Sequence, residues 1–235
     1  MPDYSIRATG EEIMDDLNCS GEVVHQTLRE LEVINRLLGG NSVTIGGIAT
    51  LLKNKSTDQP VTIADLGCGG GDILSLMAQW CRRKNINAVL TGVDANPHIT
   101  SFAKNNTRTI SEITYLTENI FSDSFRERKF DIIVGTLFFH HFTAEQLTHF
   151  FRQLKTQARI GIVINDIHRH PLAYHSIRLL TRFFSRSAMV KYDAPLSVLR
   201  SFKKNDWQTI LAHAGITNYS LRWRWAFRWQ IVIKC

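Results

Sequence analysis

Histidines follow two apolar runs that are typical of neighbouring strands. His140 and His141 come soon after one run, and His168 and His170 come soon after the next, whose last residue is Asp166. An imidazole can accept a proton from a hydroxyl group, and a carboxylate can orient that imidazole. We therefore predict a general base among His140, His141 and His168, with His170 in the adjoining pocket.

These histidines also admit two other interpretations. A histidine after a strand can simply pack or cap the next helix, and adjacent residues of an extended chain point to opposite sides. Four histidines with a carboxylate also resemble a set of metal ligands, but their spacing matches no helical zinc motif. The sequence therefore predicts no metal.

A glycine-rich segment, DLGCGGG, occupies residues 65–71. Glycines there permit a tight turn and allow a ligand to approach the backbone at Gly67 and Gly69. No Gly-Lys-Ser/Thr sequence follows, which excludes a P-loop, and the dinucleotide-binding spacing fails at its last glycine, where Asp72 stands. Asp94 ends the next predicted strand, where a carboxylate can accept both hydroxyls of a ribose. Loop and carboxylate together indicate a nucleoside-cofactor site.

The elements that position these residues alternate between apolar runs and amphipathic helices. The predicted strands are 61–65, 88–94, 113–117, 130–136 and 160–166, and the helices between them are 72–83, 97–106 and 143–156. This alternation is typical of βαβ units that form a mainly parallel sheet covered on both faces. The remaining predicted elements are helices at 22–38, 45–53 and 206–214 and strands at 218–225 and 227–234.

From residue 60 to residue 235 the sequence resembles the class I S-adenosylmethionine-dependent methyltransferases, particularly their small-molecule branch, which includes enzymes of quinone biosynthesis. The resemblance rests on the glycine-rich segment, Asp94, the run FDIIV at 130–134 with the histidines beyond it, and the closing pair of strands. It implies a doubly wound α/β fold with a mainly parallel seven-stranded sheet and a C-terminal antiparallel hairpin.

The resemblance also implies which residues bind S-adenosylmethionine. The glycine loop would contact the methionine half, Asp94 the ribose, and a polar residue after the third strand the adenine. That last position falls at Asn119, where the family more often has Asp, and Glu118 is a neighbour that could substitute for it. The complete predicted cofactor site is Asp65, Gly67, Cys68, Gly69, Asp94, Ala95, Asn119, Ile120 and Thr136.

Two segments vary most in this family and are expected to complete the site. Residues 1–57 are predicted to form an N-terminal helical lid, and residues 58–235 a methyltransferase domain with a cap insertion at about 168–202. A packing helix that merely covers the sheet is the alternative interpretation of the lid.

Methyl transfer from a sulfonium requires alignment of the acceptor, and a phenol, with a pKa of about 10, also benefits from a base. We predict O-methylation of a hydrophobic phenolic or quinone-like small molecule. Aromatic residues and one histidine are the candidates for the pocket: Phe138, Phe139, His170, Phe183 and Trp223. An RNA methyltransferase and a non-catalytic methyltransferase-like binding subunit are the alternatives.

The net charge of +7 is unevenly distributed along the 235 residues. Residues 150–235 hold 15 basic and 3 acidic residues, which gives +12, while residues 1–149 hold 13 and 18, which gives −5. A basic amphipathic helix is predicted over 174–190, and it is expected either to cap the site or to contact an anionic membrane. Alternating Trp and Arg residues in the closing hairpin would suit RNA, but no RNA-binding module accompanies them, and RNA ranks second.

Three kinds of sequence feature bear on the cellular compartment, and the sequence lacks all of them. The four cysteines form no C-x-x-C pair, no run of residues is long and apolar enough for a membrane span, and the N-terminal residues do not resemble a signal peptide. We expect a cytoplasmic protein, with peripheral membrane contact as an option. The sequence leaves the oligomeric state open.

Overall fold

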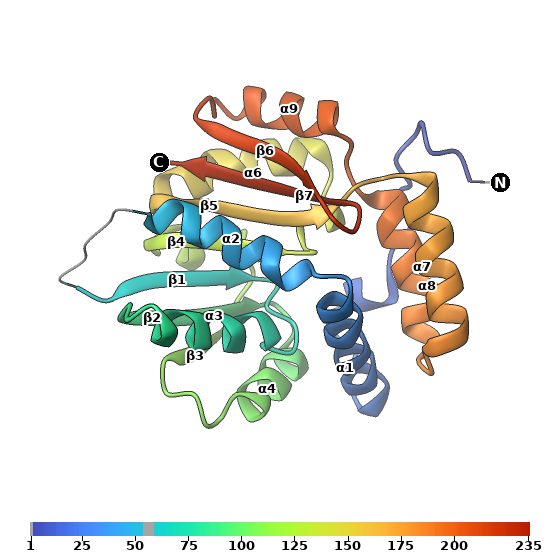
Figure 1. Cartoon of the computed structure of the whole chain (residues 1–235), viewed down its shortest axis with the longest axis horizontal. Coiled ribbons are helices and arrows are strands. Elements are labelled where there is room, and N and C mark those ends of the chain that lie inside the picture. Colours follow the sequence, from blue (N-terminus) through green and yellow to red (C-terminus); the bar gives the residue numbers. More distant parts are fainter. Residues whose placement is uncertain (1, 54–58) are drawn as a thin grey trace.

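A computed structural model describes residues 2–53 and 59–235. Its centre is a seven-stranded sheet in the order β3-β2-β1-β4-β5-β7-β6 (Figure 1). The strands are β1 (Val61–Leu66), β2 (Ala88–Asp94), β3 (Ile113–Thr117), β4 (Phe130–Thr136), β5 (Ala158–Ile167), β6 (Tyr219–Arg224) and β7 (Arg228–Lys234). The first five strands are parallel, and β7 runs antiparallel between β5 and β6. The predicted doubly wound sheet with a closing antiparallel hairpin is confirmed.

Helices pack on both faces of this sheet. In chain order they are α1 (Glu22–Leu37), α2 (Gly40–Leu52), α3 (Asp72–Arg83), α4 (Pro97–Asn106), α5 (Asp123–Arg126), α6 (Ala144–Gln157), α7 (Pro171–Phe184), α8 (Ala188–Arg200) and α9 (Lys204–His213). Alternate residues of a strand point to opposite faces. In β4, Ile132 and Val134 therefore pack with α2 and α3, whereas Ile133 packs with α6 and α9.

Local sequence signals determine where several helices begin. Asn96 caps α4 by accepting hydrogen bonds from the backbone N–H groups of His98 and Ile99, and Pro97 occupies the first turn. Thr143 and Gln146 form a reciprocal capping box at the start of α6. Both helices begin where these residue types predict.

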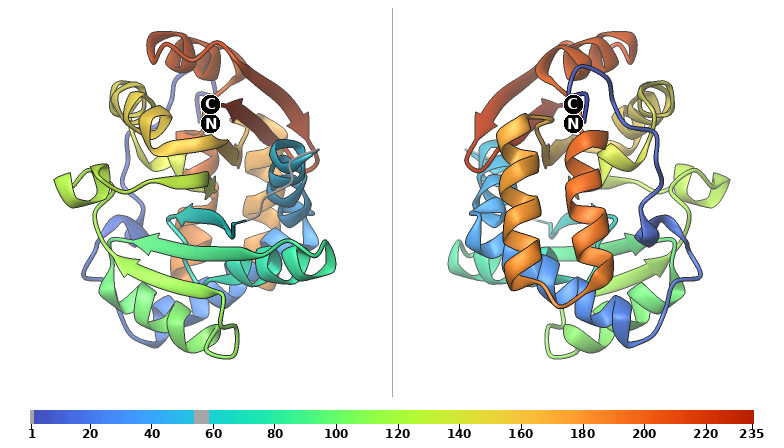
Figure 2. Two further views of the ribbon diagram at one scale, coloured as in Figure 1. Left: turned by 90° about the vertical axis from the view of Figure 1, so that its left-hand side faces the viewer. Right: turned by 90° about the vertical axis from the view of Figure 1, so that its right-hand side faces the viewer.

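The helix predicted over 174–190 is wrong in its extent. In the structure α7 ends at Phe184, and a second helix, α8, lies beside it as a hairpin (Figure 2). The Ser187 hydroxyl caps α8 by accepting from the Val190 N–H. The carboxylate of Glu30, on α1, accepts hydrogen bonds from the backbone N–H groups of Arg186 and Ser187. A contact from a distant helix thus stabilises a break that the local pattern does not reveal.

Several boundaries of the predicted organisation can be located in the structure. The boundary between lid and methyltransferase domain, at 57 and 58, lies outside the described residues. An isolated parallel bridge joins His168 to Phe202, the residues at which the predicted insertion begins and ends. Within 2–53 and 59–235, no helix combines the length and the apolar character that crossing a bilayer requires.

Candidate functional site

A cavity of about 1170 Å³ opens at the carboxyl ends of the parallel strands. Its floor is formed by the loops that follow β1, β2 and β4, and its cover by α1, α7, α8 and the segment 11–17. Ligand crevices of open α/β sheets lie at this edge, because the strand order reverses there. The predicted lid and cap therefore meet over the predicted cofactor loop.

The glycine loop lies against the other walls of the cavity, most closely at Gly67. Gly67 has φ of +64°, and a Cβ atom there would lie 2.2 Å from the ring of Phe138. Gly69 has φ of +50°, and Leu28 of α1 packs beside it. At Gly67 the backbone is left-handed and the Phe138 ring leaves no space for a Cβ atom. Only glycine can occupy this position without strain.

Two carboxylates beside this loop suit a ligand with hydrogen-bond donors. Asp65 is fully buried, burial raises its pKa well above the usual range, and its Oδ1 has no hydrogen-bond partner among the described residues. Asp94 accepts from the backbone N–H of Asn96 at 3.0 Å, and burial also raises its pKa. Buried carboxylate oxygens need hydrogen-bond donors, and the amino and hydroxyl groups of S-adenosylmethionine can supply them. These residues therefore fit the cofactor.

The other predicted cofactor residues also line the cavity. They are Cys68, Ala95, Asn119, Ile120 and Thr136. The Asn119 side-chain oxygen accepts from the backbone N–H of Phe121, whereas the neighbouring Glu118 carboxylate is held by Arg128 at 2.8 Å. Since Glu118 already has a cationic partner, Asn119 is the better candidate for adenine. Their contacts with a cofactor stay predictions.

His140 is fixed by a buried carboxylate. Its backbone N–H donates to Asp166 Oδ2 at 2.9 Å, and its Nδ1 lies 2.7 Å from Asp166 Oδ1. Burial opposes ionisation of Asp166, but the adjacent imidazole outweighs it and holds the pKa of Asp166 below its usual value. The side chain of His140 is only 2% exposed. It is therefore a structural anchor of this wall of the cavity.

His141 is the imidazole that a ligand can reach, because 23% of its side chain is exposed and it lines the cavity. Its Nδ1 lies 2.6 Å from Asp15 Oδ1. An ionised carboxylate only accepts hydrogen bonds, so Nδ1 carries the proton and a neutral ring leaves Nε2 free to accept one. Burial opposes ionisation of Asp15, but hydrogen bonds from His141 and Arg200 outweigh it and lower its pKa.

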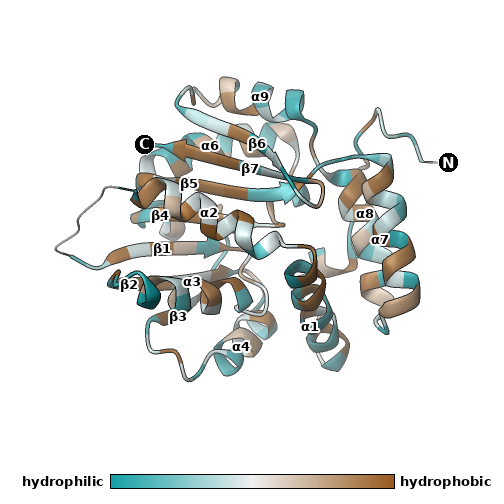
Figure 3. Cartoon of the chain, in the orientation of Figure 1, coloured by the Kyte–Doolittle hydropathy of each residue, from teal (hydrophilic) through white to brown (hydrophobic). Residues whose placement is uncertain are grey.

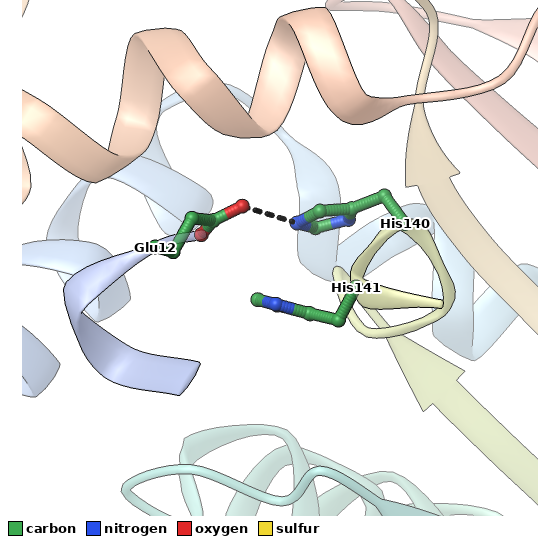
Figure 4. A group of neighbouring side chains, drawn as sticks. All are labelled: Glu12, His140 and His141. Atoms are coloured by element: carbon green, nitrogen blue, oxygen red, sulfur yellow. Dashed lines mark ion pairs between the residues drawn. The ribbon is translucent and has the colours of Figure 1, made fainter. Parts of the chain in front are cut away.

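Residues far apart in the sequence join these histidines. Glu12 Oε1 lies 3.7 Å from His140 Nε2 and 3.6 Å from Arg200 Nη1 (Figure 4). Burial raises the pKa of Glu12 to about 7. Arg200 also contacts Asp15 at 2.5 Å, and Arg7 donates to the carbonyl oxygen of His140. The sequence analysis missed Arg7, Glu12, Asp15 and Arg200, because no motif links them to the histidines.

Glu12, His140 and His141 also lie close enough to share a cation. Their possible ligand atoms fall within 4.8 Å of one another. A cation bound there would share Glu12 with the guanidinium of Arg200, and the two positive charges would repel each other. The absence of a metal from this site stays a prediction.

The structure corrects the predicted placement of two histidines. His168 does not line the cavity; it packs against Trp229 with ring centroids 4.8 Å apart, and burial lowers its pKa to about 4. His170 caps α7 by accepting from the backbone N–H of Leu172, and it stacks on Phe227. The side chains of both histidines therefore make structural contacts, where the sequence predicted contact with the methyl acceptor.

The predicted aromatic pocket also needs correction. Phe138 lines the cavity, but Phe139 is fully buried against Phe151 and Trp207 on the other side of its own turn. Phe183 and Trp223 do not line it, and they are 70% and 48% exposed. The apolar walls come mainly from the lid and cap: Ile13, Met14, Leu17, Leu28, Leu31, Ile34, Leu38, Phe142, Ile177, Leu180, Trp225 and Phe227.

Comparison with known proteins agrees with this geometry. Residues 63–161, which span β1 to β5, match a family described as "Methyltransferase domain". A Caenorhabditis elegans protein, the "electron transfer flavoprotein beta subunit lysine methyltransferase homolog", is 26% identical over an alignment of 166 residues that covers 64% of this chain and 66% of that protein.

Solved structures of low sequence identity share the fold. Human N-acetylserotonin methyltransferase in complex with S-adenosylmethionine aligns with 98% of this chain and 60% of its own, at 15% identity and a TM-score of 0.67. The plantazolicin methyltransferase BpumL aligns with 90% of this chain and 88% of its own, at 18% identity and a TM-score of 0.65. The chain thus spans about three fifths of the human enzyme.

Residues 63–161 of the chain therefore match a methyltransferase domain family, and the sheet has the fold of solved methyltransferases in complex with S-adenosylmethionine or S-adenosylhomocysteine.

Replacing Gly67 with Ala should abolish measurable cofactor binding. The new methyl group meets the Phe138 ring at 2.2 Å and also opposes a positive φ. Gly215→Ala is a matched control, since Gly215 has φ of +70° and nothing within 4 Å. Calorimetric titration with S-adenosylhomocysteine measures both variants, and equal affinities would contradict the close approach at Gly67.

Proposed function

We propose that this chain is an S-adenosylmethionine-dependent methyltransferase that methylates a hydroxyl group of a hydrophobic small molecule of the phenolic or quinone-like class. The observation that carries the proposal is the position of His141, whose free imidazole nitrogen shares one cavity with the glycine loop and the apolar walls from the lid and cap. A base is useful for this class of acceptor, because an unactivated phenol is ionised only to about 10⁻³ at neutral pH.

His141 would accept the hydroxyl proton at Nε2, while Asp15 keeps the proton on Nδ1 and fixes the ring. Asp15 is a positioning residue, since it acts through His141. Asp166 holds His140, and therefore the turn Phe139–His141 that carries His141. The apolar walls would exclude water from the acceptor.

The residues proposed to hold the cofactor are the glycine loop, Asp65, Asp94 and Asn119. S-adenosylmethionine supplies an already activated methyl group when it is bound. The protein's own contribution is then alignment and proton removal, and alignment alone corresponds to effective molarities of roughly 10⁵ to 10⁸ M.

A second candidate is methylation of a lysine side chain. The similar protein from Caenorhabditis elegans is described as a lysine methyltransferase homolog, and this similarity favours the alternative. The lid and cap also bring carboxylates to the cavity, which would attract a cationic side chain. These are Glu11, Glu12, Asp15, Asp16, Glu32 and Asp193.

The acidic lining also changes the interpretation of the charge distribution. The basic residues of the C-terminal third lie mostly outside the cavity, and Arg200 and Arg228 are the Lys and Arg residues among its described walls. The +12 charge therefore describes the outer surface of the cap and hairpin and gives no reason to prefer an anionic acceptor.

Substitution of His141 with Gln tests the proposed base. We expect kcat towards a phenolic acceptor to fall about 10²- to 10⁴-fold, since that is the usual contribution of a general base. Affinity for S-adenosylhomocysteine should stay unchanged. His149→Gln, on the exposed face of α6, is the matched control.

The acceptor class is tested by the transfer of a labelled methyl group from S-adenosylmethionine to two panels, one of phenols and hydroquinones and one of lysine-containing peptides. Label in the phenols, with none in the peptides, supports the proposal. Label in lysine alone would overturn it in favour of the second candidate.

We also propose that the cap contacts an anionic membrane surface through α7. The ribbon of α7 carries both hydrophobic and hydrophilic residues (Figure 3), and apolar side chains on it are exposed beside Arg178 and Arg182. The apolar residues are Leu172, Leu179, Phe183 and Phe184. Apolar side chains flanked by arginines suit the interface of an anionic bilayer, from which a lipophilic acceptor could reach the cavity beneath.

The double variant Leu179→Ser/Phe183→Ser should no longer co-sediment with phosphatidylserine vesicles, while the wild-type protein does. Val89→Ser, an exposed apolar residue on β2, is the control and should bind as the wild type does. Failure of the wild-type protein to bind either anionic or phosphatidylcholine vesicles would remove the proposal.

A further inference from the structure

Of the two arginines that line the cavity, one has no ion-pair partner among the described residues. Arg228, the first residue of β7, is 4% exposed and lines the cavity where the β5 strand ends. Among the described residues its guanidinium has one hydrogen-bond partner, Asn165 Oδ1, at 3.3 Å. No carboxylate of the described residues lies within ion-pair distance of it, in contrast to Arg169 and Arg200, the other buried arginines.

A buried guanidinium without an anion is costly, because it gives up its hydration and gains little in return. Burial lowers the pKa of Arg228 only to about 10, so the group remains charged at neutral pH. The nearby carboxylate Asp166 attracts Arg228 and raises its pKa, but it forms no ion pair with it, and its hydrogen bonds go to His140 and the Ile167 N–H. Within residues 2–53 and 59–235, Arg228 is thus a buried cation with no carboxylate in direct contact.

The surroundings of Arg228 form a polar corner in an otherwise apolar end of the cavity. Asn35, on α1, is buried and lines the same space, and its Oδ1 has no hydrogen-bond partner. Both side chains lie against Gly40, where an added Cβ would be 1.9 Å from Asn35 Oδ1 and 2.7 Å from Arg228 Cζ. Gly40 therefore leaves room for these polar groups between the lid and the sheet.

We propose that Arg228 forms a carboxylate-binding subsite of the cavity, beside which Asn35 Oδ1 can accept a hydrogen bond from a donor group of the same ligand. A guanidinium presents paired donors that match a carboxylate in a planar, two-point contact. Two ligands of the proposed reaction could supply the carboxylate: the amino-acid end of S-adenosylmethionine or an acceptor that bears an acidic group. The inference rests on the proposed function for the identity of these ligands.

The cofactor arm of the test compares S-adenosylhomocysteine with 5′-methylthioadenosine, which lacks the amino-acid end. Calorimetric titration of wild type and Arg228→Gln gives both affinities. If the cofactor supplies the carboxylate, Arg228→Gln weakens binding of S-adenosylhomocysteine about 30-fold or more and leaves methylthioadenosine unchanged, as expected when one partner of a buried charge pair is removed.

The acceptor arm compares 4-hydroxybenzoate with 4-hydroxybenzamide in the presence of saturating S-adenosylhomocysteine. If the acceptor supplies the carboxylate, the wild type prefers the acid about 30-fold or more, and Arg228→Gln loses this preference while cofactor affinity stays unchanged. Both arms measure binding without turnover, so their outcome is independent of whether His141 is the base.

Arg222→Gln, an exposed arginine on the neighbouring strand β6, is the matched control and should bind every ligand as the wild type does. Should Arg228→Gln fail to fold by circular dichroism, Arg228→Lys retains the charge but loses the two-point contact, and a smaller loss of affinity is expected. Unchanged affinity for both carboxylates in a folded Arg228 variant would overturn the proposal.

Discussion

The burial of Asp166 is the constraint on which the site depends. A carboxylate that is fully buried must be surrounded by donors, and Asp166 obtains them from the His140 backbone, the His140 ring and the Ile167 N–H. These bonds join the end of β5 to the turn after β4. They hold His140 in the wall of the cavity, and the ring of His141 lies beside it with centroids 4.3 Å apart.

The same requirement connects the N-terminal segment to the cap. Arg200, on α8, is buried and is neutralised by Asp15 and Glu12, while Arg7 binds the carbonyl groups of His140 and Arg200. Each of these charges finds its partner on a different element, so the lid, the cap and the β4 turn are fixed together. Such networks are worth little as net stability but define one arrangement of the groups. Among the buried arginines of the described residues Arg228 alone has no ion pair, and that is why it indicates a ligand.

The sequence predicts the sheet well and the acceptor side poorly, for physical reasons. Strand alternation, the caps at Asn96 and Thr143 and the glycine loop are local signals, and the structure places those elements within a few residues of their predicted bounds. The break at 185–187 depends on Glu30, and the contact of Asp15 with His141 bridges 126 residues. Phe183 was predicted to face inward because an amphipathic pattern reveals two faces of a helix but not which of them is covered.

The central claim is that the cofactor and His141 share one cavity, with the cofactor held by the carboxylate at the end of β2. Calorimetric titration of S-adenosylhomocysteine into wild type and Asp94→Ala tests this most directly, with Asp123→Ala, an exposed carboxylate in α5, as the control. The account predicts an affinity about 10- to 100-fold weaker for Asp94→Ala, since a hydrogen bond to a charged group contributes about 1.5–3 kcal/mol. Wild-type affinity in a folded Asp94→Ala variant would contradict it.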